Sequence, residues 1–379
     1  MNKKLKVLPI LAMGLMLVAC NGGTSSSTKP TSKNDDVNFT LKVGSYVELV
    51  KNDPTNTNTI AVSSAAVILK DDTIVDAYFD VLQAPFTITD GGKVSILTTG
   101  KHQTEQAGDK VIETKQELKE RYGMASSAAE GEWNVQAASF ARYTVGKTID
   151  EVTSKNYKNH YNKNGTEVVT GCSISQTNFT TALKVITDTK TFKAPANTVS
   201  AGLGYKVSAL SADNVLTVTL AGSATDKDGK IYETSINAYQ IPLKVSSTDA
   251  TKIAYNPINS KNKEYAQLKA ENFKDHTTAS ADNKYYTEVL SKRELKEKYA
   301  MKENNEEAQK MEWYNQANNF ARYAKDKNVS VLQENLGKYK GTEHNQNGTI
   351  EVAGCTISMD DFATSIIKSN TNKSGLKAK

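Results

Sequence analysis

The stretch Glu132-Trp-Asn-Val-Gln-Ala-Ala-Ser-Phe-Ala-Arg-Tyr143 returns as Glu312-Trp-Tyr-Asn-Gln-Ala-Asn-Asn-Phe-Ala-Arg-Tyr323, with eight of twelve residues identical. In the first version, six residues recur with the period of one helical face. These are Trp133, Gln136, Ala137, Phe140, Ala141 and Thr144. The second version keeps Trp313, Gln316, Ala317, Phe320 and Ala321. Both stretches therefore predict an amphipathic helix with the same buried face.

Two further blocks flank this helix and repeat in the same order. Before it, Lys115–Met124 returns as Lys292–Met301, with seven of ten residues identical. After it, Gly171-Cys-Ser-Ile-Ser175 returns as Gly354-Cys-Thr-Ile-Ser358. Three matched blocks in one order indicate a domain present twice. We expect the two copies to span residues 38–195 and 200–375 and to fold separately. The linker between them is expected near Lys193–Gly204.

Each copy is expected to be α+β, with antiparallel strands in front and helices behind. Apolar runs on either side of a turn predict one hairpin per copy. The runs and turns are Val67–Lys70, Asp71-Asp72 and Ile74–Phe79, then Val215–Leu220, Asp228-Gly229 and Ile231–Ile236. The polar segment from Val245 to Tyr286 is expected to be a surface loop.

The helices carry recognisable start signals. Thr114 with Glu117, and Ser291 with Glu294, have the spacing of capping boxes. After an Asn-Gly turn in each copy (Asn164-Gly165 and Asn347-Gly348) we expect a short strand, the Gly-Cys-hydroxyl segment and a last helix. The buried face of that helix is predicted at Phe179, Ala182, Leu183 and Ile186, and Ser358 with Asp361 resembles its cap in the second copy.

The N-terminus is typical of an exported, lipid-anchored protein. Three Lys residues precede an apolar run from Val7 to Val18, which is shorter than the about 20 residues needed to cross a bilayer. Leu17-Val-Ala-Cys20 resembles a lipobox, so residues 1–19 are expected to be a lipoprotein signal peptide and Cys20 the lipidated residue. An ordinary secretory signal with a chance Cys is the alternative. Residues 20–37 form a polar, flexible tether.

Charge and cysteine usage exclude several classes of function. The chain has 47 Lys and Arg against 42 Asp and Glu, and losing the three Lys of the signal leaves a net charge of +2. The basic and acidic residues are interleaved, so nothing indicates nucleic acid binding. Besides Cys20 the chain has only Cys172 and Cys355, expected to be free thiols, and four His, which support no metal or haem site.

The Gly-Cys-hydroxyl segment is the candidate site. A strand entering a helix through Gly171-Cys172-Ser173, or Gly354-Cys355-Thr356, brings backbone N–H groups and a hydroxyl together, an arrangement that favours a phosphate. The simpler interpretation is a tight turn whose hydroxyl caps the helix. The tryptophans at the start of the preceding helix are interpreted as core residues rather than as stacking partners of a ligand.

The same residues resemble the acceptor motif of covalently flavinylated proteins, commonly Asp-x-x-Ser/Thr-Gly-Ala-Thr. Thr170–Ser173 and Ala353–Thr356 match with Cys in place of Ala, and the acidic position holds Glu167 in the first copy and is shifted to Glu351 in the second. Together with the hairpin and helix blocks, the chain resembles FMN-binding lipoproteins of Gram-positive bacteria, of the PplA type. The resemblance covers nearly all of residues 38–372.

This resemblance implies two FMN-binding-like domains with up to two covalent FMN groups, attached through phosphoesters to Ser173 and Thr356 by an ApbE-type flavin transferase. It implies a redox carrier, rather than a catalyst, on the extracellular face of the cell membrane. Its partners would be the lipid bilayer through Cys20, a membrane electron donor and extracellular electron acceptors. The alternative is a non-redox surface lipoprotein, whether a ligand binder, adhesin or immunogen, whose FMN-binding-like fold has lost the flavin.

Overall fold

The structure is a computed structural model, and it describes residues 36–52, 57–88, 94–96, 103–106, 109–208, 215–242, 244–245, 253–254, 289–299, 301–304, 311–339, 350 and 352–375. These residues belong to one compact unit of the chain, Asp35–Lys379. The predicted signal peptide, Cys20 and almost all of the tether lie outside the described residues, as do the turn at Asn347-Gly348 and most of the segment from Val245 to Tyr286.

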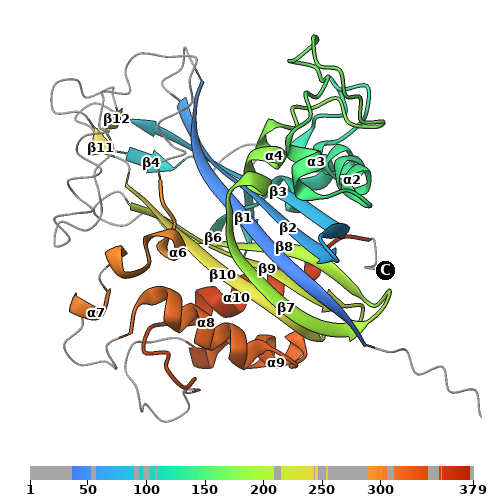
Figure 1. The fold of residues 1–379 in the computed structure, drawn as a ribbon. Coiled ribbons are helices and arrows are strands. Elements are labelled where there is room, and N and C mark those ends of the chain that lie inside the picture. The colour runs from blue at the N-terminus through green and yellow to red at the C-terminus, as the bar shows by residue number, and fades with distance from the viewer. Residues whose placement is uncertain are drawn as a thin grey trace, which may run out of the picture. The chain divides into compact units, whose positions relative to one another are not determined.

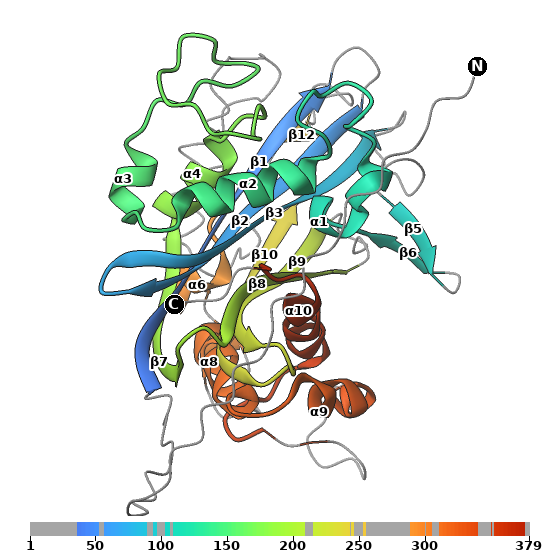
Figure 2. The same cartoon turned by 90° about the vertical axis from the view of Figure 1, so that its right-hand side faces the viewer.

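Two antiparallel sheets form the centre of this unit (Figures 1 and 2). The larger has the strand order β4-β3-β2-β1-β7, the smaller the order β10-β9-β8, and two further pairs join β5 to β6 and β11 to β12. The strands are β1 Asp36–Asn52, β2 Thr57–Lys70, β3 Thr73–Ile88, β4 Val94–Ile96, β5 Gln103–Gln106, β6 Asp109–Ile112, β7 Ile186–Pro195, β8 Val199–Val207, β9 Val215–Asp226, β10 Ile231–Pro242, β11 Lys244–Val245 and β12 Ile253–Ala254.

Both predicted hairpins are confirmed. Strands β2 and β3 pair up to Lys70 and Thr73, and the two turn residues, Asp71 and Asp72, have φ of 49° and 63°. Two left-handed residues produce the turn whose twist matches that of the flanking strands, which explains the Asp-Asp sequence. The β9–β10 hairpin turns through Gly229, whose φ is 86°.

The helices confirm the predicted starts and the predicted buried face. Both capping boxes form, at Thr114 with Glu117 and at Ser291 with Glu294. Every residue predicted for the buried face of α2 and of α8 is buried. The helices are α1 Lys115–Leu118, α2 Trp133–Thr144, α3 Ile149–Thr153, α4 Thr177–Lys184, α6 Lys292–Leu295, α7 Met301–Asn304, α8 Trp313–Ala324, α9 Val329–Glu334 and α10 Asp360–Thr371, with short 3-10 helices at Lys119–Tyr122, Lys296–Tyr299 and Leu336–Tyr339. The structure is thus α+β, as predicted.

The predictions for the last helix of each copy were partly wrong. Helix α4 ends at Lys184, and Ile186 begins β7, because the residues that follow find strand partners on β1. Helix α10 begins at Asp360 with Met359 as its N-cap residue, so Ser358 lies one position too early to cap it. The Ser358 hydroxyl instead donates to the Asp360 carboxylate.

Two connecting segments also differ from the prediction. The short strand expected after Asn164-Gly165 is only an isolated bridge between Tyr157 and Glu167. The link expected at Lys193–Gly204 is mostly strand, because β7 continues to Pro195 and β8 begins at Val199. Strand β7 is hydrogen-bonded to β1 and strand β8 to β9, so only residues 196–198 between them remain as a linker.

Three apolar clusters divide the unit into four layers. One cluster lies between the larger sheet and helices α2 and α4, and an equivalent cluster lies between the smaller sheet and helices α8 and α10. The third cluster takes side chains from both sheets, among them Phe39, Leu41, Leu203 and Tyr205. The two sheets therefore pack on each other, and the helices of the two halves lie on opposite outer faces (Figure 1).

Polar contacts between the halves are buried in the same interface. The Asp76 carboxylate on β3 accepts hydrogen bonds from the Ala201 N–H group (2.7 Å) and from the Ser374 hydroxyl (2.5 Å). Arg293, which is 6% exposed, forms an ion pair with Asp188 on β7 at 3.1 Å. These buried polar contacts fix how one sheet lies on the other, because a shift that separates the partners would leave a buried charge without compensation.

Asp80 makes the stability of the fold depend on pH. Its Oδ1 accepts the N–H groups of Val81 (2.7 Å) and Gln116 (3.2 Å), and burial raises the pKa of the carboxyl to about 7. On β10 the same place is taken by Asn237, whose Oδ1 accepts two equivalent backbone N–H groups without carrying a charge.

We therefore expect Asp80→Asn to stabilise the protein by about 4 kcal/mol at pH 8 and hardly at all below about pH 4. The folded state holds the Asp80 proton up to about pH 7, whereas the unfolded state releases it near the ordinary value of 3.8. The stability that Asp80 contributes is therefore complete below about pH 4, falls as the pH rises from there to about 7, and changes little above that pH. Urea unfolding at several pH values measures this, with the exposed Asp150→Asn as control. Identical pH profiles for wild type and Asp80→Asn contradict it.

Candidate functional site

Each Gly-Cys-hydroxyl segment forms a tight turn against the main helix of its half. The Cys172 N–H group donates to the Val169 carbonyl at 3.1 Å, and Cys355 makes the same bond to Val352 at 2.9 Å. Gly171 and Gly354 both have φ of 74°, a left-handed conformation that glycine adopts without strain. A Cβ on Gly354 would also lie 2.1 Å from Asn319 Nδ2, so that side chain would have to move.

The hydroxyls that the sequence singles out are held by a glutamine of that helix. Ser173 donates to Gln136 Oε1 from its hydroxyl (3.2 Å) and from its N–H group (2.8 Å). Thr356 makes the same two bonds to Gln316 Oε1, at 3.1 Å and 2.7 Å. Each glutamine is anchored at its other end, where Nε2 donates to a backbone carbonyl.

Neither interpretation of these hydroxyls from the sequence is correct in detail. Helix α4 begins at Thr177 and α10 at Asp360, so each hydroxyl lies four residues before its helix and caps nothing. The N-terminus of each helix, where a phosphate was expected to bind, is therefore also four residues away from the hydroxyl. Ser173 and Thr356 are positioned instead by the preceding helices, α2 and α8. The contact is made by Gln136 or Gln316, which the sequence predicted only as a residue of the buried helix face.

Accessibility distinguishes the two hydroxyl residues. Ser173 is partly exposed, whereas Thr356 is 8% exposed. The N–H group of His160 donates to the Ser173 carbonyl at 2.7 Å, and the next residue, Tyr161, is 80% exposed. Ser173 is therefore the more accessible of the two hydroxyl residues, and an exposed aromatic ring lies nearby in the chain.

An arginine lies beside each turn, and sequence reasoning did not assign it a role. Arg142 Nη2 donates at 2.8 Å to the Ser139 hydroxyl, which would lie 2.9 Å from a Cβ on Gly171. Arg322 donates to the Asn319 side chain, which in turn donates to the Gly354 carbonyl at 2.8 Å. Both arginines are exposed, and both lie in an identical Phe-Ala-Arg-Tyr sequence. An exposed residue kept in both copies is the signal from which sequence reasoning could have found them.

The two cysteines are free and buried, as expected. Burial raises the pKa of the Cys172 thiol to about 11 and that of Cys355 to about 12. Both thiols are therefore protonated at neutral pH and unreactive as nucleophiles. The Cys355 thiol donates to the Gln316 carbonyl at 3.1 Å, so the cysteine packs the turn against the helix.

The acidic position of the motif has a partner of its own. Glu167 accepts a hydrogen bond from the Tyr143 hydroxyl and lies 3.8 Å from the Lys155 ammonium. In the second half, Ile350 takes this place, and the matching tyrosine, Tyr323, bonds to Tyr339 instead at 3.1 Å. Glu351 lies outside the described residues. Glu167 thus orders the segment before the turn through Tyr143.

The tryptophans are core residues. Trp133 and Trp313 are 4% and 3% exposed, and each packs edge-on against the first aromatic residue of the last helix in its half. The ring centroids of Trp133 and Phe179 are 5.6 Å apart, and those of Trp313 and Phe362 are 5.5 Å apart. This agrees with the interpretation drawn from the sequence.

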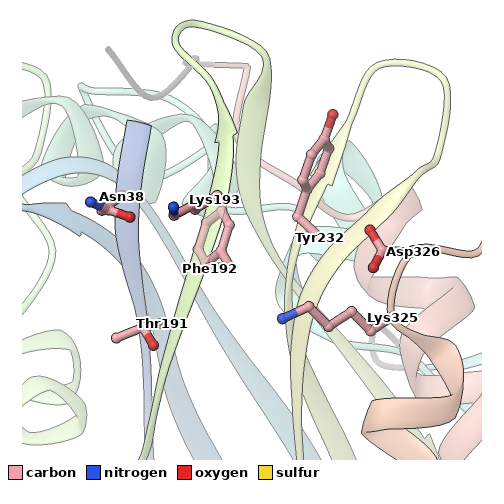
Figure 3. Close-up of a pocket in the computed structure, with 7 residues that line it drawn as sticks. All are labelled: Asn38, Thr191, Phe192, Lys193, Tyr232, Lys325 and Asp326. Carbon is pink, nitrogen blue, oxygen red and sulfur yellow. The ribbon is translucent and has the colours of Figure 1, made fainter. Parts of the chain in front are cut away.

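A cavity of about 440 Å³ lies elsewhere, between residues of β7 and β10 and the segment that follows α8 (Figure 3). Its lining residues are Asn38, Thr191, Phe192, Lys193, Tyr232, Lys325 and Asp326, so it contains none of the candidate site residues. Within the described ranges, no group of His, Cys, Asp or Glu has the arrangement of a metal site, and no helix is long and apolar enough to cross a membrane.

Comparisons with protein-family models, curated proteins and solved structures gave no match.

Proposed function

We propose that this protein is a lipid-anchored electron carrier on the outer face of the cell membrane, built from two FMN-binding-like domains. Each domain carries one FMN, joined by a phosphoester to Ser173 or Thr356. The observation that carries this proposal is that both halves place a hydroxyl in the same arrangement. A glutamine oxygen accepts a hydrogen bond from the hydroxyl, a left-handed glycine precedes the turn, and an arginine lies beside it.

This arrangement suits attachment through a phosphate. With its proton directed at the glutamine Oε1, the Ser173 oxygen keeps its lone pairs free to attack the FMN phosphorus of FAD. The new bond is Oγ–P, the bond to AMP breaks, AMP leaves with its electron pair, and the hydroxyl proton passes to the flavin transferase. Arg142, which bonds to Ser139 beside the turn, would neutralise the negative charge on the resulting phosphodiester.

The attached flavin would supply one- and two-electron chemistry, and the chain supplies its attachment, orientation and electrostatic surroundings. A covalent bond keeps the cofactor on a protein that stands outside the cell. The partners of such a carrier are the flavin transferase, a membrane electron donor and extracellular acceptors. The lipobox-like Leu17–Cys20 and the polar tether support the anchoring.

The two candidate sites occupy opposite outer layers of the described unit, with both sheets between them (Figure 1). Electron tunnelling falls steeply with distance, so we infer that the two flavins exchange electrons with partners independently. The protein then works as two carriers on one tether rather than as a relay in which one flavin reduces the other.

A surface lipoprotein without flavin is the second candidate. The 8% exposure of Thr356 favours it, because a flavin transferase must reach the acceptor hydroxyl. Cys172 and Cys355, which replace the usual Ala of the motif, also favour it. The protein would then bind a ligand or a host surface through other residues.

Co-expression with a flavin transferase and FAD separates the two candidates. We expect the purified protein to gain the mass of one FMN, less water, per modified domain, and its flavin fluorescence to survive denaturation and gel separation. An inactive transferase serves as negative control and a protein with an established acceptor motif as positive control. If the positive control is labelled and this protein gains no mass, the redox-carrier proposal fails.

A further inference from the structure

The cavity of about 440 Å³ is lined by both halves of the unit, one wall from each (Figure 3). The wall of the first half carries Asn38 on β1 and Thr191, Phe192 and Lys193 on β7. The wall of the second half carries Tyr232 on β10, with Lys325 and Asp326 directly after α8. The volume lies within the range of ligand pockets, about 300–1,000 Å³. Because neither half supplies the whole lining, the cavity exists only when the two sheets are packed together.

Two hydrogen bonds show which residues of the first half correspond to the second wall. The N–H group of Ile74 donates to the Lys147 carbonyl, and that of Ile231 donates to the Lys327 carbonyl, both at 2.9 Å. At the corresponding positions the first half has Val75, Val145 and Gly146, and the second half has Tyr232, Lys325 and Asp326. Each second-half residue that lines the cavity is therefore larger and more polar than its counterpart.

Asp326 adopts a backbone conformation that suits glycine. Its φ is 63°, and the corresponding Gly146 has φ of 83°. In both halves the N–H group at this position donates to the isoleucine carbonyl, at 2.9 Å from Gly146 and 2.8 Å from Asp326. Aspartate tolerates this conformation better than most residues, but glycine adopts it without strain, and such outliers cluster at ligand sites. Since glycine forms the turn equally well, the carboxylate of Asp326 points to a role at the cavity.

Opposite charges face the cavity from its two walls. Lys193 is exposed and makes no ion pair with another described residue. On the other wall, the side chain of Asp326 is 69% exposed and lies 3.6 Å from the Lys230 ammonium, too far for a hydrogen bond. Lys325 is already paired with Glu233 at 2.9 Å. Of the charged groups in the lining, Lys193 and Asp326 are thus left to bind a ligand.

Two aromatic rings and two uncharged polar groups complete the lining. The ring centroids of Phe192 and Tyr232 are 6.5 Å apart, and Phe192 is stacked on Phe39 at 5.6 Å. Thr191 and Asn38 are exposed, and neither side chain forms a hydrogen bond to another described residue. The cavity therefore combines an apolar surface with donors and acceptors that the described chain does not satisfy itself.

We propose that this cavity binds a short peptide with free termini and an aromatic side chain. Lys193 pairs with the terminal carboxylate and Asp326 with the terminal ammonium, while the aromatic side chain packs on the two rings of the lining. The peptide group between the termini bonds to the free amide and hydroxyl. A simple anion would be repelled by Asp326, a simple cation by Lys193, and a neutral saccharide would leave both charges unpaired. This ligand site is separate from the proposed flavin attachment and does not depend on it.

Calorimetric titration of the full chain with the dipeptide alanyl-phenylalanine tests the proposal. We expect saturable binding of one dipeptide per chain, because the first half has no counterpart of the charged second wall. Acetylating the amino end or amidating the carboxyl end should each weaken binding about tenfold, since each change removes one paired charge. Absence of saturable binding, or equal binding of the three forms, overturns the proposal. Binding of the uncharged disaccharide chitobiose in place of the dipeptide also overturns it.

Two substitutions locate the binding. Lys193→Met should weaken dipeptide binding about tenfold and remove the effect of amidating the carboxyl end. Asp326→Gly, which restores the residue of the first half, should weaken binding to the same extent and remove the effect of acetylation. Its melting temperature should change little, because relief of the left-handed strain offsets the greater freedom of glycine in the unfolded chain.

Asp72→Gly is the matched control for Asp326→Gly. Asp72 also has φ of 63°, but it lies in the turn between β2 and β3 and does not line the cavity. This variant gains the same conformational relief and should bind the dipeptide as the wild type does. If Lys193→Met and Asp326→Gly bind the dipeptide as tightly as Asp72→Gly, the peptide does not occupy this cavity and the proposal is wrong.

Discussion

Expressed separately, residues 36–195 and residues 199–375 will each fail to fold cooperatively. The apolar cluster between the two sheets belongs to both halves, so either half alone exposes one whole face of its sheet. From the larger sheet, this cluster includes Phe39, Leu41, Val43, Val47, Ile60, Val62, Ala66, Ile68, Leu82, Ala84, Phe86, Phe192 and Ala194. An exposed apolar face of that extent promotes aggregation, and the helices on the opposite face do not cover it.

The repeat in the sequence predicts the opposite result, namely two independently folding copies. The measurement is thermal and urea unfolding of each half, with binding of an apolar dye as a second probe. As the control, co-expression of the two halves should restore a single cooperative transition. Two halves that each unfold cooperatively, without dye binding, would show that the shared cluster is dispensable.

The second large effect is the complete loss of flavin from the substituted half. Ser173→Ala should abolish labelling of the first half and Thr356→Ala that of the second, because each removes the oxygen that is proposed to form the phosphoester. The double variant should gain no flavin mass. Peptide mass spectrometry after proteolysis locates the modification on each half. Because Ser173 is the more exposed residue, we expect it to be labelled faster than Thr356.

Two kinds of control keep this result interpretable. Ser175→Ala removes a hydroxyl two residues away, which contacts only Thr177 among the recorded bonds, and should leave labelling unchanged. Thr356→Ser keeps a hydroxyl at the acceptor position and should restore labelling. Persistent labelling of Ser173→Ala on another residue of the same peptide would contradict the assignment of the acceptor, although not the flavin itself.

Local structure followed from the sequence where neighbouring residues decide it. The capping boxes at Thr114 and Ser291 form because a side chain and a backbone group three residues away satisfy each other. The buried face of α2 follows from the helical period alone. The turn at Asp71-Asp72 follows from its length and from residues that tolerate a left-handed backbone. The same local signals located the two glycine turns that hold the candidate acceptors.

Contacts between distant residues could not be predicted in this way. Ile186 reads as the continuation of a helix, and only the unpaired edge of β1 makes it the start of a strand. Gln136 reads as one more buried residue, and only the approach of the Gly171 turn shows that its amide holds Ser173.

The sequence by itself determined the repeat, the elements and the two candidate hydroxyls of this protein, because each depends on residues close together in the chain. The tertiary structure alone decided that the sheets share one core and that the two sites lie on opposite faces. These arrangements depend on which apolar faces meet, and each face of β1 and β2 is buried by a different partner.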